Sequence, residues 1–220
     1  MADLNLEQAR FNMVEQQVRT WEVLDPRTLD VMDRVLREHF VEAHHRNLAY
    51  SALHLPLGHD QVMLSPKQEG RILQAVAPRE TEQVLEIGTG SGYLTACLAT
   101  LSRHVTSIDI FPDFLEQAQG RLEREALRNV SLISGDAARG WDDGKRYDAI
   151  AVTGSLPELH RGFHQSLTIG GRLFVVVGTD PIMEALLITR VAEDQWAEES
   201  IVDTHLPPLI NAPQSRRFTL

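Results

Sequence analysis

Between residues 66 and 177 the chain alternates short apolar runs with longer amphipathic stretches. Short apolar runs bounded by turn formers are typical of buried strands, and apolar positions at helical spacing are typical of helices. The runs predict strands at Val84–Ile87, His104–Ile110, Val130–Ile133, Tyr147–Val152 and Arg172–Val177. The amphipathic stretches predict helices at Pro66 to about Val76, from Leu94 onwards, at Phe111 to about Leu127, and one that opens at Pro157.

The two ends of the chain follow other patterns. Leu4–Trp21 has a ragged helical pattern, and Asp25-Pro26 predicts the start of a second helix, with Asp as its cap and Pro at the first helical position. Pro and Gly break His39–Pro66 into turns and short extended pieces, and Ile169-Gly170-Gly171 predicts another turn. Three further segments have β-like composition with no helix between them, at about Ala185–Val191, Glu198–Asp203 and Leu206–Ile210.

This order of elements predicts an α/β fold. Strands that alternate with helices and then follow one another directly indicate a doubly wound, mostly parallel, Rossmann-like sheet with helices on both faces. We expect the N-terminal helices to form a cap beside the sheet and the last strands to pair in antiparallel. We expect one compact unit, with residues 1–65 as helical cap and lid loop and residues 66–220 as the ligand-binding domain.

Three glycines follow the strand Val84–Ile87 at every second position, Gly88, Gly90 and Gly92. They predict a strand-to-helix turn where a ligand can approach bare backbone and the N–H groups of a helix N-terminus. Asp109 ends the next predicted strand, about twenty residues after the first glycine. A carboxylate at that place accepts hydrogen bonds from ribose hydroxyls in nucleotide-binding βαβ units. These features in this order predict an adenosine-containing cofactor.

The acid that precedes the glycines helps to choose among such cofactors. Glu86 opens the run Glu86-x-Gly88-x-Gly90-x-Gly92, which differs from the G-x-G-x-x-G fingerprint that seats a dinucleotide pyrophosphate. An acid that faces the turn repels a pyrophosphate and attracts the amino group and sulfonium of S-adenosylmethionine. The spacing therefore favours S-adenosylmethionine, with S-adenosylhomocysteine as product, over NAD.

Composition and net charge limit the possible binding partners and the possible cellular compartment. The net charge of −10 argues against non-specific nucleic-acid binding, because a phosphate backbone favours Lys and Arg patches. The single cysteine, Cys97, allows no disulfide within the chain, which fits a reducing cytoplasm. The chain opens with no signal-peptide pattern and has no apolar stretch long enough to span a membrane. We expect a cytoplasmic protein with no membrane partner, whose oligomeric state stays open.

Further candidate side chains lie at other predicted strand ends. Gly135-Asp136-Ala137 follows Val130–Ile133, and there Asp136 either reaches an adenine amino group or caps the following turn. Thr153 ends the strand Tyr147–Val152 and is expected at the same edge of the sheet. The His44-His45 pair has no acid or cysteine at metal-ligand spacing, so no metal site is predicted.

Several motifs occur in a fixed order along the chain. They are LPLG at Leu55–Gly58, VLEIGTGSGY at Val84–Tyr93, Gly135-Asp136, YDAIAVT at Tyr147–Thr153, GGRLFVVVG at Gly170–Gly178 and LPPL at Leu206–Leu209. Together they resemble the protein-L-isoaspartate O-methyltransferases, class I S-adenosylmethionine-dependent enzymes that methylate the abnormal carboxylate of isoaspartyl residues in damaged proteins. VLEIGTGSGY alone marks many methyltransferases, whereas the ordered set is more specific. The resemblance extends from roughly Phe40 to Ile210.

The lid segment departs from this family. The family usually has G-Q-T-I-S-x-P after LPIG, with the serine against cofactor and substrate carboxylate, whereas this chain places Leu64 at that position. A leucine side chain cannot donate a hydrogen bond. A site that binds a polar acceptor therefore discriminates less well between acceptors when this donor is missing. Either Ser65 takes the role of the serine through a local shift, or the acceptor differs. Ser65 also has a simpler interpretation, which we favour, as the cap of the helix that begins at Pro66.

The resemblance implies a site at the sheet edge. Gly88–Gly92 with Glu86 hold the methionine part, Asp109 holds the ribose, and the lid Gln61–Ser65 covers the methyl. The full set of expected cofactor-binding residues is Glu86, Gly88, Thr89, Gly90, Gly92, Asp109, Ile110, Gly135, Asp136, Ala137 and Thr153, with Ser65 and Leu64 as the candidate catalytic positions.

Three functions remain open at this point. The first is methyl transfer to isoaspartyl carboxylates of proteins or peptides. The second, suggested by Leu64, is a divergent methyltransferase that acts on another protein or a small molecule. The third is a protein that binds S-adenosylmethionine without catalysis, and an NAD oxidoreductase is a more distant alternative.

Overall fold

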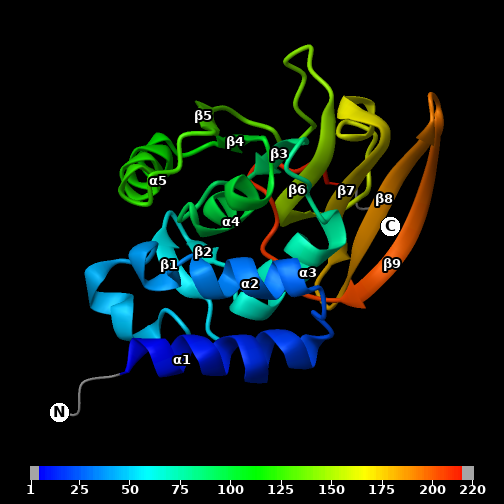
Figure 1. The fold of residues 1–220 in the computed structure, drawn as a ribbon. Coiled ribbons are helices and arrows are strands. Elements are labelled where there is room, and N and C mark those ends of the chain that lie inside the picture. The colour runs from blue at the N-terminus through cyan, green and yellow to red at the C-terminus, as the bar shows by residue number, and fades with distance from the viewer. Residues whose placement is uncertain (1–4, 215–220) are drawn as a thin grey trace, which may run out of the picture.

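The computed structural model describes residues 5–214 and shows a seven-stranded mixed sheet (Figure 1). Its strand order is β5-β4-β3-β6-β7-β8-β9. The strands are β3 (Gln83–Ile87), β4 (His104–Asp109), β5 (Val130–Ser134), β6 (Tyr147–Leu156), β7 (Leu167–Thr179), β8 (Ile182–Ala192) and β9 (Gln195–Asp203). Pairing is parallel from β5 across to β7 and antiparallel for β7–β8–β9. The mixed sheet with helices on both sides confirms the predicted α/β class.

Three α-helices match stretches that were predicted to be helical: α3 (Pro66–Val76), α4 (Tyr93–Leu101) and α5 (Pro112–Arg124). A helix that is apolar all round is buried. This describes α4, which contacts β4 and α2 (Pro26–Arg34) and has seven of its nine residues buried. Among residues 5–214, no helix combines the length and the apolar character that crossing a membrane requires.

The N-terminal segment packs directly on α3 and α4 (blue in Figure 1). It consists of α1 (Leu6–Asn12), a π-helical turn η1 (Met13–Val18), a 3₁₀ turn η2 (Arg19–Trp21) and α2. Leu4 lies outside the described residues. Gly70 of α3 permits the close approach, since an added Cβ would lie 2.8 Å from Val18. One hydrophobic cluster joins Met13 of this segment with Val84 of β3, so the cap and the sheet share a core.

The irregular segment predicted before α3 contains short elements. They are the 3₁₀ helices η3 (Arg37–His39) and η4 (Ala43–Leu48), and an antiparallel hairpin of β1 (Leu55–Gly58) and β2 (Gln61–Met63). The hairpin ends directly before α3.

The prediction of a helix that begins at Pro157 is wrong. β6 continues to Leu156, because Ser155 exchanges backbone hydrogen bonds with the C-terminal segment, donating to Pro207 O (2.8 Å) and accepting from Leu209 N (2.9 Å). Only the 3₁₀ helix η5 (His164–Ser166) is found before β7. Gly162 packs against Arg139, where an added Cβ would lie 1.8 Å from the carbonyl oxygen, so tertiary contacts dictate the path of this segment.

Two further expectations need correction. Ile169-Gly170-Gly171 is a bulge inside β7 and not a turn, since β6 pairs Tyr147 with Leu167 and then Ala149 with Arg172. The segment Leu206–Ile210 forms no strand. Its backbone hydrogen bonds go to Ser155 of β6, with a single bridge between Ser155 and Pro208.

The fold predicts which apolar deletions destabilise the protein. Leu98 of α4 is fully buried, so Leu98→Ala should lower the free energy of unfolding in urea by about 2–5 kcal/mol. Leu48, which is 41% exposed, serves as the control, because Leu48→Ala should change stability by less than about 0.5 kcal/mol. Equal effects at the two positions would contradict the packing described above.

Candidate active site

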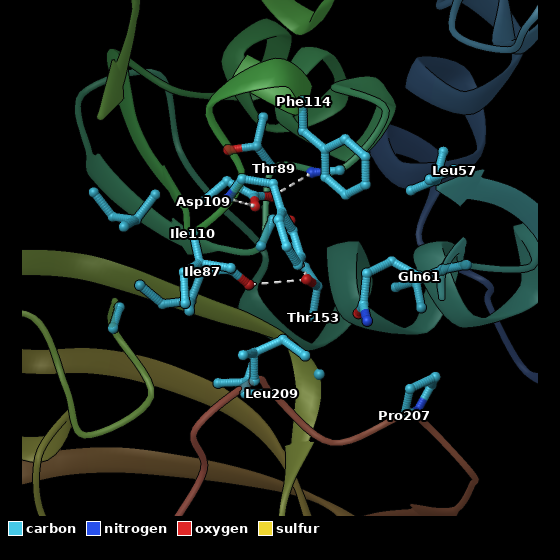
Figure 2. A pocket seen from close by; sticks show the side chains of 18 of the residues that line it. Leu57, Gln61, Ile87, Thr89, Asp109, Ile110, Phe114, Thr153, Pro207 and Leu209 are labelled. Carbon is cyan, nitrogen blue, oxygen red and sulfur yellow. Dashed lines mark hydrogen bonds between the residues drawn. The ribbon is translucent and has the colours of Figure 1, made fainter. Parts of the chain in front are cut away.

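A pocket opens at the carboxyl ends of the parallel strands (Figure 2). It holds about 920 Å³ of empty space, part of it open to solvent. Ligands of open α/β sheets bind at this edge. The walls come from the ends of β3, β4, β5 and β6, from the β1–β2 hairpin and from the C-terminal segment, and they include Leu57, Gln61, Leu64, Glu69, Gly88–Ser91, Asp109–Phe111, Phe114, Gly135–Ala138, Thr153, Gly154 and residues 207–210.

The floor of the pocket is the glycine turn after β3. Gly88, Gly90 and Gly92 all have positive φ, of 94°, 49° and 84°. A Cβ on Gly88 would lie 2.1 Å from Thr153 Oγ1. The Thr153 hydroxyl donates to the carbonyls of Ile87 (2.8 Å) and Gly88 (3.0 Å), which ties the turn to β6 (Figure 2). Gly88 and Gly90 therefore line the pocket with bare backbone.

Asp109 stands at the end of β4 beside this turn. Its carboxylate accepts hydrogen bonds from Gly90 N and Phe111 N, both at 2.9 Å. Burial raises the pKa of Asp109 above its usual range, and these backbone donors counteract the shift. The carboxylate thus joins the glycine turn to the start of α5. A ribose contact remains a prediction, and Asp109 and Ile110 both line the pocket as it requires.

The end of β5 contributes Gly135, Asp136 and Ala137, all of them in the pocket wall. Asp136 accepts from Ala138 N (3.0 Å) and from the Asn211 side chain (2.8 Å). It therefore caps its own turn, and it also fastens the C-terminal segment beside the pocket. The cap and a contact with adenine are compatible, because the residue still lines the cavity.

Glu86 is not among the lining residues. It is fully buried below the glycine turn, where one carboxyl oxygen accepts from Thr95 and Ser107 and the other oxygen has no hydrogen-bond partner within residues 5–214. Burial raises its pKa to about 8, opposed by the bonds from Ser107 and Thr95. Glu86 therefore makes no direct contact with a ligand in this geometry, although it lies next to the lining residues Ile87 and Gly88.

The structure places the two candidate lid residues, Leu64 and Ser65, in different environments. Leu64 lines the pocket, whereas Ser65 is buried and absent from the lining. Ser65 is the N-cap of α3, where Gln68 Oε1 accepts from both Ser65 N (3.1 Å) and Ser65 Oγ (2.7 Å). This geometry supports the interpretation of Ser65 as the cap, and a catalytic role of its hydroxyl stays an untested prediction.

Several lining residues were missed from the sequence. Phe111 and Phe114 stand at the start of α5, and His59 of the hairpin stacks on Phe111 at 4.2 Å and bonds Asp113. An aromatic residue two positions after the strand-terminal acid was a usable signal. Glu69 also lines the pocket, and its partner Arg37 is 32 residues away, so only the folded chain brings the two together.

The charges of the residues that line the pocket indicate which kind of ligand it can bind. Glu69, Asp109 and Asp136 contribute carboxyl groups, and the pocket lining within the described chain includes no Lys, Arg or His. Bare backbone and carboxyl groups without a cation suit the sulfonium and ammonium of S-adenosylmethionine and disfavour a pyrophosphate. Within residues 5–214 no three His, Cys, Asp or Glu side chains gather as a metal site.

Comparisons with known proteins show what the whole chain is similar to. The family model of protein-L-isoaspartate(D-aspartate) O-methyltransferase matches residues 8–211. A protein-L-isoaspartate O-methyltransferase 1 of Rhodopseudomonas palustris (strain HaA2) is 38% identical over 202 residues, 91% of this chain and 82% of that protein. A protein-L-isoaspartate O-methyltransferase 2 of Marinobacter nauticus is 35% identical over 94% of each chain. A Plasmodium falciparum structure described as a protein-L-isoaspartate O-methyltransferase with S-adenosyl-L-homocysteine has a TM-score of 0.77 at 18% identity, covering 91% of this chain and 97% of that one, which shows the shared fold.

The geometry of Ser65 predicts a stability effect. Loss of its cap in Ser65→Ala should lower the free energy of unfolding by about 0.5–2 kcal/mol, with unchanged affinity for S-adenosylhomocysteine by calorimetry. Ser51→Ala, which removes an exposed hydroxyl, is the control for the loss of a serine. A Ser65→Ala protein of native stability and lost affinity would instead place this hydroxyl at the ligand.

Proposed function

The chain belongs to the protein-L-isoaspartate(D-aspartate) O-methyltransferase family, S-adenosylmethionine-dependent enzymes that act on damaged proteins, and we propose that the pocket of Figure 2 is where this methyl transfer takes place. The observation that carries the proposal is the combination of a bare glycine turn, the lining carboxyl groups of Asp109 and Asp136 and, among residues 5–214, no lining cation at the sheet edge. That combination suits a cationic nucleoside.

We assign the cofactor to the strand ends. The turn from Gly88 to Gly92, with Thr89, would hold the methionine part, Asp109 and Ile110 the ribose, and Gly135–Ala137 the adenine. Thr153 acts through Gly88, because its hydroxyl holds that carbonyl in place. Glu86 lies below the glycine turn and makes no contact with the cavity.

S-adenosylmethionine supplies a methyl group that is already activated by its sulfonium. What remains for the protein is to align the acceptor with that methyl and to exclude water. The hairpin residues Leu57 and Leu64 and the C-terminal Leu209 give the pocket apolar walls suited to both tasks. A carboxylate acceptor is ionised at neutral pH and requires no general base.

The partner, on this proposal, is a protein or peptide that carries isoaspartate. With a net charge of −10, nucleic acid is not among the proposed partners. We place the enzyme in the cytoplasm, since its single cysteine, Cys97, is a buried thiol. We also propose that residues 1–65 act as cap and lid on the methyltransferase domain 66–220.

Asp109 tests the cofactor assignment. Asp109→Ala removes a carboxylate that is 7% exposed and should weaken S-adenosylmethionine binding by about 1–3 kcal/mol. Titration calorimetry measures the affinity, with Asp30→Ala on the surface of α2 as control. Unchanged affinity in a folded Asp109→Ala protein would remove this residue from the site.

The acceptor is tested by methylation of an isoaspartyl peptide with labelled cofactor. We expect label in the isoaspartyl peptide and none in the matched aspartyl peptide. The departure at Leu64 favours one competing function, a methyltransferase for another acceptor. Cofactor binding without methylation of either peptide would support that alternative.

A further inference from the structure

An acceptor carboxylate meets few hydrogen-bond donors in this pocket. Leu64 brings no hydroxyl to the lid, and no Lys, Arg or His lines the pocket within residues 5–214. The hydroxyl of Thr153 is already engaged with two carbonyls, and that of Thr89 pairs with Ser107 at 2.6 Å. Among the other lining side chains, the Gln61 amide donates to His59 O at 3.2 Å and the Ser91 hydroxyl accepts from Tyr93 N at 3.2 Å. A lining carboxyl group that carries a proton is a further candidate donor.

Glu69 lies directly beside position 64. The fully buried guanidinium of Arg37 donates to Leu64 O at 2.6 Å, to Ala49 O at 2.7 Å and to one carboxyl oxygen of Glu69. The Leu64 carbonyl and the Glu69 carboxyl are thus held by the same guanidinium. This places Glu69 next to Leu64 of the lid.

The second carboxyl oxygen of Glu69 has no hydrogen-bond partner within residues 5–214, and the residue lines the pocket although only 2% of it is exposed. The charged and titratable groups that face it are Arg37 from η3, Glu86 from β3, and Tyr93 and Cys97 from α4. Arg37 is the one cation among them. The carboxyl therefore presents a free edge toward the ligand space.

We propose that Glu69 holds the methyl acceptor, its free oxygen carrying a proton that it donates to one oxygen of the acceptor carboxylate. This inference rests on the proposed function. Two ionised carboxylates in contact repel each other, and one shared proton removes that repulsion. The proton stays on Glu69 while the other acceptor oxygen forms the bond to the methyl carbon. The carbon–sulfur bond breaks, and the products are a neutral ester and S-adenosylhomocysteine.

Burial supports a protonated Glu69. It raises the pKa of this carboxyl to about 7, although the charge of Arg37 opposes the shift. The required form is the protonated one, which predominates below that pKa and disappears as the pH rises through it. The kcat/KM for the acceptor should therefore be level from about pH 5, where the acceptor carboxylate is ionised, to about pH 7 and fall above that.

The deciding variant is Glu69→Gln. Its amide keeps an oxygen for Arg37 and an N–H donor for the acceptor, and it does not titrate. We expect acceptor KM within a few-fold of the wild type near pH 6 and no fall in kcat/KM above pH 7. Glu116→Gln on the exposed face of α5 is the matched control and should retain the wild-type pH profile.

Two further variants extend the test. Glu69→Ala should raise the acceptor KM about tenfold or more while the Kd of S-adenosylmethionine stays unchanged. Because this variant leaves Arg37 unpaired and can fail to fold, Leu64→Ser provides a second measurement. Its hydroxyl donates at any pH, so activity above pH 8 should rise relative to the wild type.

The inference is overturned by identical pH profiles of wild type and Glu69→Gln. It is also overturned if Glu69→Gln weakens cofactor binding and leaves the acceptor KM unchanged, since Glu69 would then be a counter-ion of the cofactor. A wild-type protein that binds cofactor but methylates no isoaspartyl peptide would refute the proposed function itself, and this inference with it.

Discussion

The geometry of the pocket depends on the glycine turn after β3 being held from two sides. Thr153 fastens it to β6 through the Gly88 carbonyl, and Asp109 fastens it to β4 through Gly90 N. A side chain at Gly88 would occupy the position of the Thr153 hydroxyl. Without these two hydrogen bonds the backbone groups that line the cavity would not keep a fixed position and orientation. The site would then lose its preorganisation for a ligand.

Charge is distributed in layers around that turn. Asp109 and Asp136 line the cavity with their carboxylates bonded to backbone N–H groups, whereas Glu86 lies buried beneath, bonded to hydroxyls. Burial raises the pKa of Glu86 to about 8, and proximity to Asp109 adds to the shift. A cationic ligand in the cavity favours the ionised form of every one of these groups. The anionic layers thus complement a sulfonium nucleoside through charge as well as through shape.

The lid is linked to this centre through Arg37. Its guanidinium joins the segment that ends at Ala49, the lid at Leu64 and α3 at Glu69. On the opposite side, His59 at the tip of the hairpin stacks on Phe111 and pairs with Asp113. The hairpin is therefore fixed at its base by the buried guanidinium of Arg37 and at its tip by exposed contacts. Exposed pairs contribute little to stability, so the tip is the more easily displaced end.

The sequence by itself determined the βα units, the position of the glycine turn and the family, because apolar runs, glycines and a strand-terminal acid are local signals. It also identified Ser65 as a cap, since Ser before Pro is a local start signal. The rest was decided in three dimensions. Hydrogen bonds to distant segments decide three features that the sequence analysis predicted incorrectly. These are the absence of an α-helix that begins at Pro157, the bulge at Gly170 and the loop path of Leu206–Ile210. Glu69 became a candidate only when folding placed Arg37 between it and Leu64, because a contact across 32 residues leaves no periodic trace in a single sequence.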